Sequence, residues 1–297
     1  MKGKTAATWI LILLLCAGTL AGVVWADRQE NGSATLSQTM SEKTSSGSKT
    51  KQKESAEKNQ KTQGKVPKKE TQETKPKTEK TQQEKLTAEF AKEKQEWYLR
   101  LANVDHPLPE DFTVETQEVQ NGYKLDSRIA AQAKEMIEAA RQDGVELLVC
   151  SAYRSIEKQT NLFNKMKQDY LAQGYSEEQA YAKTATAIAI PGTSEHQSGL
   201  AADIVTPSHQ TLDPAFADTA AGQWLVEHAH EYGFVLRYPE EKQDITKIIY
   251  ESWHFRFVGK THAKLMKEQN LCLEEYLELE VPKGYTGIRD PFENPEN

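Results

Sequence analysis

The strongest structural signal in this 297-residue chain is the segment Thr193-Ser-Glu-His196-Gln-Ser-Gly-Leu-Ala-Ala-Asp203-Ile204. Its first half is rich in turn-forming residues, and its second half is apolar and typical of a buried strand over 200–205. A carboxylate inside such a strand is costly to bury without a partner, and a metal cation would remove that cost. The position of Asp203 therefore indicates a cationic partner, and His196 is a candidate neighbour.

A second segment with the same character is Tyr250-Glu251-Ser-Trp-His254-Phe-Arg-Phe-Val258, which we expect at a strand end. Together His196, Asp203 and His254 would offer a zinc ion two imidazoles and one carboxylate, which leaves the fourth position for water, as in catalytic sites. Glu251 is then a candidate base. The spacing alone leaves alternatives open, because Asp203 could be a helix or turn partner and Glu251 a solvated carboxylate.

A third segment, Cys150-Ser-Ala-Tyr-Arg154-Ser155, directly follows a strand expected over 145–149. An arginine at the carboxyl end of a core strand is well placed to meet an anionic group in a cleft. A salt bridge to a surface carboxylate is the alternative. The sequence contains no Gly-x-Ser-x-Gly motif, phosphate loop or dinucleotide fingerprint.

The elements around these segments predict an α+β domain, with a small antiparallel sheet flanked by helices. Asp126 is a candidate N-cap for a helix that ends at Gly144, and Ser176 with Gln179 resembles a capping box. The hydrophobic pattern predicts further helices over 157–173, 176–190, 215–232, 262–269 and 273–279, and further strands over 234–236 and 248–251.

The composition excludes several classes of protein. A mean hydropathy of -0.72 is too polar for a polytopic membrane protein, and three cysteines are too few for a disulfide scaffold. Cys150 and Cys272 could pair outside the cell, but we expect them to be buried free thiols. Residues 27–85 carry 14 basic and 9 acidic residues, whereas residues 86–297 carry 21 basic and 35 acidic residues. Because the body is acidic, we do not expect it to bind nucleic acid.

The N-terminus, residues 1–26, has Lys2 and Lys4 followed by an apolar run, which just reaches the ~20 residues a membrane-spanning helix needs. We expect an uncleaved membrane anchor with the body outside the cytoplasm, although the next segment is basic. A cleaved signal peptide ending at Ala26 is an alternative. A lipid-modified Cys16 is less favoured, because Leu15 is bulky where a lipoprotein signal has a small residue.

The rest of the chain divides by composition. Residues 27–85 contain no Phe, Trp or Tyr, and such a segment cannot bury enough apolar surface to fold. We therefore expect a disordered basic linker over 27–96, with transient helix near 84–95. Residues 97–284 would form the single domain, and 285–297 a C-terminal tail.

Taken together, the three segments resemble the VanY-type D-alanyl-D-alanine carboxypeptidases, zinc peptidases of bacterial cell-wall metabolism. Their order and spacing cover about 180 residues, from near Asn103 to Leu277. Supporting matches are His106-Pro-Leu-Pro, Gly233-Phe-Val-Leu-Arg-Tyr-Pro239 and Leu273-Glu-Glu-Tyr-Leu277. The resemblance implies the fold of the lysostaphin, D-Ala-D-Ala peptidase and hedgehog superfamily, with zinc in a cleft.

By matching position, the resemblance implies one catalytic Zn²⁺ held by His196, Asp203 and His254, with Glu251 as general base. Arg154 matches the arginine that contacts the substrate. Gln159 and Ser194 match positions expected to bind the peptide.

The resemblance also implies the substrate. It would be the free C-terminus of a peptidoglycan stem peptide or of its lipid-linked precursor, with D-alanine released. Trimming this residue can remove the target of glycopeptide antibiotics. Three alternative functions remain open. They are an L,D-carboxypeptidase that acts on tetrapeptide stems, an endopeptidase, and a non-catalytic cell-wall-binding module.

Overall fold

The computed structural model describes residues 75–293. Its centre is a four-stranded antiparallel sheet with the strand order β3-β4-β6-β5. All residues of the two central strands are buried, because side chains pack on both faces of the sheet. The α+β class is therefore confirmed. The strands are β3 Leu148–Ser151, β4 Ala201–Val205, β5 Phe234–Leu236 and β6 His254–Phe257.

The register of the central strands brings two predicted site residues together. Asp203 on β4 is directly opposite His254 on β6, and it is also paired with Ser151 on β3. Directly opposite residues of an antiparallel pair direct their side chains to the same face. The carboxylate and the imidazole are therefore neighbours although 51 positions separate them in the chain.

The strand expected over 248–251 is wrong. This segment is a loop that follows α7 (Gln243–Thr246), and the fourth strand begins only at His254. Its backbone bonds go to other loops and helices, with the Ile249 N–H donating to the Thr186 carbonyl and the Glu251 N–H to that of Tyr238. The apolar run here has the composition of a strand but no strand beside it.

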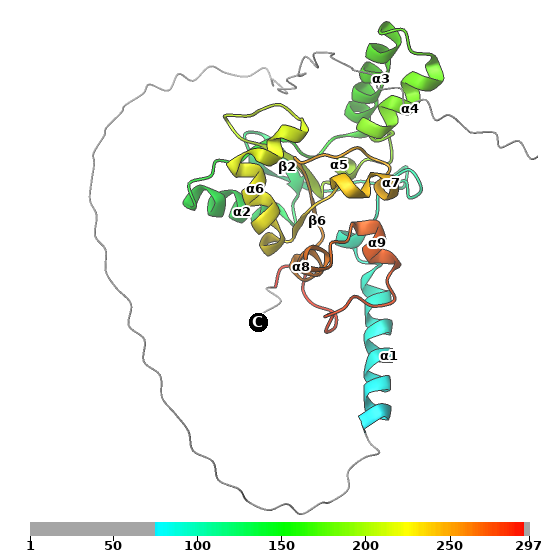
Figure 1. Cartoon of the computed structure of the whole chain (residues 1–297), viewed down its shortest axis with the longest axis vertical. Helices are drawn as coiled ribbons and strands as arrows, with labels where there is room; N and C mark the ends of the chain where they lie inside the picture. Colours follow the sequence, from blue (N-terminus) through cyan, green and yellow to red (C-terminus); the bar gives the residue numbers. More distant parts are fainter. Residues whose placement is uncertain (1–74, 294–297) are drawn as a thin grey trace, which may run out of the picture. The chain divides into compact units, whose positions relative to one another are not determined.

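Helices surround the sheet, and α3 and α4 lie side by side as a hairpin at one end of the domain (Figure 1). The capping box of Ser176 and Gln179 is present at the start of α4. Besides α7, the α-helices that follow β2 are α2 Ala130–Gln142, α3 Ile156–Ala172, α4 Glu177–Ala187, α5 Glu195–Ser198, α6 Ala220–His228, α8 Lys260–Gln269 and α9 Leu273–Glu278.

The segment before α2 differs from the prediction. Asp126 does not cap the helix, because its carboxylate instead accepts hydrogen bonds from the backbone and side chain of Arg128, and Ile129 occupies the N-cap position. Asp126 also ends a hairpin that we did not predict. The hairpin joins β1 (Thr116–Gln120) and β2 (Tyr123–Asp126).

The domain extends beyond the expected limits of 97 and 284 at both ends. Helix α1 (Lys75–Glu93) ends inside the region assigned to the linker, and Phe90 is fully buried with its ring edge-on to Tyr276 and Tyr285. From Leu86 onward the chain packs with the domain, so a linker boundary at 96 is too late. Tyr285 is also buried, so the domain continues beyond residue 284.

The predictions for residues 1–26 and for most of the linker lie outside the described residues. Within 75–293, none of the helices has the length and apolarity needed to cross a bilayer. In the same range Cys150 and Cys272 are free, as expected, but only Cys272 is buried, whereas Cys150 is partly exposed.

Candidate metal centre

Three side chains from separate elements form a cluster that could hold a metal ion. His196 comes from α5, Asp203 from β4 and His254 from β6, and one ligand atom of each lies within 4.8 Å of the others. All three residues are buried, with 2–3% of their surface exposed. The structure thus brings together the three residues that the sequence singled out.

The hydrogen bonds of the two rings fit metal binding. The Nδ1 of His196 lies 2.7 Å from the carbonyl oxygen of Ala152, and the Nε2 of His254 lies 3.4 Å from Oε2 of Glu195. Metal-binding histidines characteristically donate their outer ring N–H to such an oxygen. The inner nitrogens, Nε2 of His196 and Nδ1 of His254, then face Asp203, at 3.3 and 3.0 Å from its carboxylate oxygens. Two imidazoles and one carboxylate are ligands that zinc accepts, so the donor set fits this ion.

Local geometry fixes His196. Helix α5 ends at Gly199, whose φ of +72° favours glycine, and a Cβ there would lie 3.0 Å from the Asp126 backbone nitrogen. The His196 carbonyl also accepts a hydrogen bond from the Arg154 N–H at 3.1 Å. The short helix is thereby held between β2 and the loop that follows β3.

Arg154 reaches the same cluster. Its Nη2 lies 2.7 Å from Asp203 Oδ2 and 2.8 Å from Nε2 of His196. The side chains of Ser151 and Gln159 accept from its other nitrogens, at 2.9 and 3.2 Å. A surface salt bridge does not describe this arginine, because its side chain is 14% exposed and that of its partner Asp203 only 3%.

Glu251 is beside the cluster rather than in solvent. Its Oε2 lies 3.6 Å from Nδ1 of His254, and its side chain is 11% exposed. Burial, together with the nearby carboxylate of Asp203, raises the pKa of Glu251 to about 8. This glutamate is therefore a buried carboxyl group whose affinity for a proton is strengthened.

The charges of the cluster depend on one another. Burial alone would raise the pKa of the Asp203 carboxyl, but His196, His254 and Arg154 hold it well below its usual range. Burial would lower the pKa of His254, but its bonds to Asp203 and Glu195 raise it to about 9. Proton binding and metal binding at this ring therefore compete.

The two weaker site predictions, Gln159 and Ser194, lie in different surroundings. Gln159 is fully buried, with Oε1 accepting from Arg154 and Nε2 donating to the Ala189 carbonyl at 2.7 Å, so both polar groups already have protein partners. Ser194 is buried immediately before α5, next to the cluster, and its side chain does not cap that helix.

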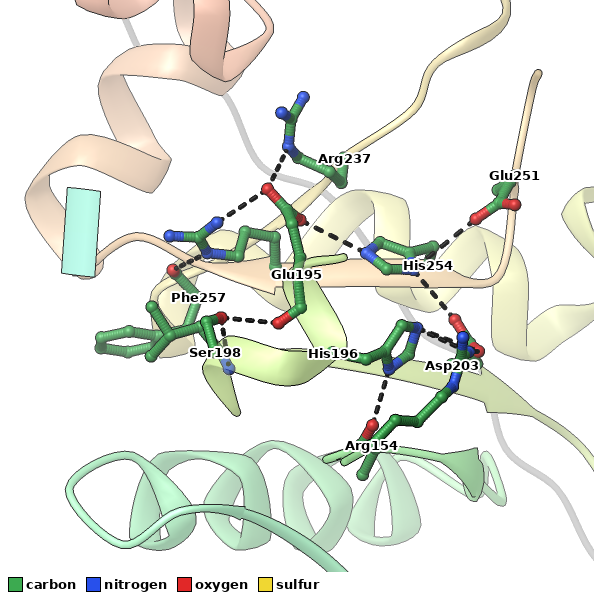
Figure 2. A network of polar contacts seen from close by, with 12 residues as sticks. Arg154, Glu195, His196, Ser198, Asp203, Arg237, Glu251, His254 and Phe257 are labelled. Carbon is green, nitrogen blue, oxygen red and sulfur yellow. Dashed lines mark hydrogen bonds and ion pairs between the residues drawn. The ribbon is translucent and has the colours of Figure 1, made fainter. Parts of the chain in front are cut away.

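Sequence reasoning missed a buried charge network behind His254. Glu195 accepts hydrogen bonds from Arg237 and Arg256, each at 2.7 Å. Figure 2 shows Glu195 across the ring of His254 from Asp203. Arg256 carries the same signal as Asp203, because it is a charged residue between Phe255 and Phe257 in a buried strand. That signal could have indicated the network.

An α+β domain in which two histidines, one aspartate and a buried glutamate meet beside the central sheet has the features of a metal-dependent hydrolase. The chain belongs to the VanY family of D-alanyl-D-alanine carboxypeptidases, whose family model matches residues 122–260. It is 41% identical over 195 residues to a D-alanyl-D-alanine carboxypeptidase of Enterococcus faecalis, covering 65% of this chain and 70% of that protein. It is also 39% identical to the putative carboxypeptidase YodJ of Bacillus subtilis, covering 63% and 69%.

Solved structures agree with this membership. VanYB in complex with D-alanine-D-alanine has a TM-score of 0.57 and 41% identity, covering 61% of this chain and 98% of that one. A VanY mutant from a VanB-type vancomycin resistance cassette, in complex with Zn(II), has a TM-score of 0.57 and 40% identity, covering 62% and 100%. The LdcB LD-carboxypeptidase has a TM-score of 0.52 and 37% identity, covering 61% and 85%.

Proposed function

We propose that this protein is a zinc-dependent D-alanyl-D-alanine carboxypeptidase that removes the terminal D-alanine from peptidoglycan stem peptides. The observation that carries the proposal is the buried cluster of His196, Asp203 and His254, whose ligand atoms lie within 4.8 Å, with Glu251 beside it. Support comes from relatives of the same family, among them one solved with Zn(II) and one with D-alanine-D-alanine.

In this proposal His196, Asp203 and His254 hold the zinc ion. When bound, such an ion acts as a Lewis acid and lowers the pKa of a coordinated water from about 16 toward 7. Asp203 contributes the negative charge that offsets the cation, and the acceptors behind the two imidazoles orient the rings.

Glu251 moves the proton in this mechanism. Its carboxylate accepts a proton from the water that attacks the peptide carbonyl and returns it to the amine of the departing D-alanine. Burial keeps bulk water from competing for the proton.

Arg154 supplies a fixed positive charge at the reacting centre. Its planar guanidinium can donate two parallel hydrogen bonds to an oxyanion or to the terminal carboxylate of the peptide. Ser151 and Gln159 accept from its Nε and Nη1, whereas its Nη2 contacts the Asp203 and His196 atoms proposed to hold zinc and has to leave them when the ion binds. We assign Gln159 this supporting role, and Ser194 a contact with the peptide.

The proposed setting follows from the N-terminus. An anchor over 1–26 and a basic linker would place the domain outside the cytoplasm, within reach of the wall near its membrane. The substrate is then a stem peptide of the wall or its lipid-linked precursor. Loss of the terminal D-alanine would remove the D-Ala-D-Ala end from that peptide.

A second candidate is an L,D-carboxypeptidase that acts on tetrapeptide stems. The observation in its favour is the LdcB LD-carboxypeptidase, which is 37% identical to this chain, close to the 41% of VanYB. The zinc ligands and the base would be unchanged, and only the contacts to the penultimate residue of the peptide would differ.

The test is hydrolysis of a pentapeptide and a tetrapeptide stem by the zinc-loaded full chain, with products identified by mass. We expect D-alanine release from the pentapeptide and loss of activity on treatment with a chelator. Release from the tetrapeptide with little from the pentapeptide would replace the D,D-assignment by the L,D-assignment. Release from neither, with zinc bound, would contradict both.

A further inference from the structure

Glu195 is the most completely enclosed carboxylate beside the metal cluster. Its side chain is 0% exposed, although the preceding polar turn gives no indication of burial. Oε1 accepts from Nε of Arg237 and from Nη1 of Arg256, both at 2.7 Å. Oε2 lies 3.4 Å from Nε2 of His254.

The imidazole of His254 is thus held from both edges. Nδ1 faces Asp203 at 3.0 Å, inside the cluster, and Nε2 faces Glu195 on the outer side (Figure 2). An imidazole that binds a metal through one nitrogen carries its proton on the other, and an anionic acceptor at that proton fixes the tautomer and the ring orientation. Glu195 is the acceptor in the position to do so.

The two arginines hold Glu195 in place. Arg256 also donates to the carbonyls of Arg100 and Tyr98, at 2.7 and 3.2 Å, which joins β6 to the turn around η1 (Trp97–Leu99). Arg237 forms a bidentate ion pair with Glu274 on α9, in which Nη1 donates to Oε2 at 2.7 Å and Nη2 to Oε1 at 2.6 Å. The carboxylate therefore has little freedom to leave the ring of His254.

We propose that Glu195 is a positioning residue for the metal site, which holds His254 through Nε2 and directs Nδ1 at the ion. The proposal deepens the proposed function by adding a residue that touches neither the metal nor the substrate. It rests on metal binding by the cluster and does not require the D,D-specificity.

The chain offers a matched control. Glu274 is part of the same network and also binds Arg237, but it does not contact His254. Removing the charge of either glutamate leaves a buried arginine less well paired, so both changes should destabilise the fold. Only the change at Glu195 alters the acceptor of His254.

The experiment compares Glu195→Gln, Glu274→Gln and the unchanged full chain. We would measure zinc affinity by competition with a chromophoric chelator and the melting temperature of the metal-free protein. We expect both variants to melt at lower temperature, Glu195→Gln to lose about 10- to 100-fold in zinc affinity, and Glu274→Gln to stay within about threefold. Equal zinc affinities in the two variants would contradict the proposal, because the network would then act only on stability.

A second measurement covers the case in which Glu195→Gln does not fold. Nitrogen-15 spectra of the zinc-loaded, histidine-labelled chain report which ring nitrogen of His254 carries the proton. We expect a protonated Nε2 and a metal-bound Nδ1, and metal bound through Nε2 would overturn the proposal. Zinc affinity and the protonated nitrogen of His254 both report on metal binding and not on catalysis. A chain that binds zinc normally but releases no D-alanine would therefore contradict only the proposed function.

Discussion

Glu251 and His254 are three positions apart, and 3.6 Å separates the carboxylate Oε2 of Glu251 from Nδ1 of His254. Of the two, only His254 lies between Asp203 and Glu195, in a position to bind the metal. Because one residue would hold the metal and the other would move the proton, their loss should have different consequences.

We therefore expect Glu251→Gln to retain zinc but to lower the turnover number by about 10²-fold or more. The substitution keeps the size of the side chain and removes the group that accepts the proton. Bound zinc is measured by elemental analysis, and turnover by release of D-alanine. A zinc-loaded Glu251→Gln protein with unchanged turnover would show that another group is the base.

Single residues explain how far the site could be predicted from sequence. Asp203 was predictable because a charge inside an apolar strand has to be compensated. Glu195 was not, because it follows a polar turn, and only the fold shows that Arg237 and Arg256 close over it. Gln159 matched a peptide-binding position, yet its two polar groups are used by Arg154 and Ala189.

At the scale of elements, capping signals were more informative than apolar runs. The capping box before α4 was confirmed because it depends on two side chains and their own backbone. The strand expected over 248–251 was wrong because a β-branched run becomes a strand only where another strand is free to pair with it. The pairing partner of β4 is supplied by the next segment, from His254.

The turn after α5 is the element that sets the position of His196. We expect Gly199→Ala to cost about 1–2 kcal/mol from its left-handed backbone, with a further cost because the new Cβ would lie 3.0 Å from the Asp126 nitrogen. Relief of that contact should shift α5 and lower zinc affinity. Chemical denaturation and chelator competition measure the two effects.

Gly174→Ala is the control for this change. Gly174 also has a positive φ, of +90°, but a Cβ there would meet nothing within 4 Å. This variant should show a similar backbone cost with zinc affinity unaltered. If both variants bind zinc as the unchanged chain does, the turn after α5 does not position His196.

On the scale of the whole molecule, the end of α1 belongs to the catalytic domain. The composition of α1 resembles that of the linker, and Phe90 is the only aromatic residue between 27 and 96. The average composition of this segment therefore gives no sign that α1 packs on the domain. In the fold this ring is fully buried between Tyr276 and Tyr285.

We expect Phe90→Ala to destabilise the domain by about 3–5 kcal/mol, because it leaves a cavity among large aromatic side chains. The free energy of unfolding from urea denaturation checks this value. Lys92→Ala on the exposed side of the same helix is the control and should change stability by no more than about 0.5 kcal/mol. If Phe90→Ala lowers the free energy of unfolding no more than the control does, then α1 does not contribute to the stability of the domain.

Glu93, at the end of α1, should make the stability of the domain depend on pH. Burial alone would raise the pKa of Glu93, but hydrogen bonds from His262, Tyr285 and Tyr98 hold it below its ordinary value of 4.5. A carboxylate with a lowered pKa in the folded state adds stability above pH 4.5, and that stability is lost as the pH falls through the folded pKa. The unchanged chain should therefore lose its advantage over Glu93→Gln progressively below pH 4.5, as measured by urea denaturation across that range. A difference between the two proteins that stays constant with pH would show that the ionised Glu93 is not what holds α1.

The central claim is that one zinc ion, held by His196, Asp203 and His254, makes this domain a carboxypeptidase. Its most direct test is zinc content measured together with D-alanine release from a pentapeptide stem, for the full chain and for His254→Ala. We predict one zinc per chain and release of D-alanine for the unchanged protein, and neither for His254→Ala after removal of loosely bound metal. A His254→Ala protein that keeps one tightly bound zinc and normal release of D-alanine would contradict the claim.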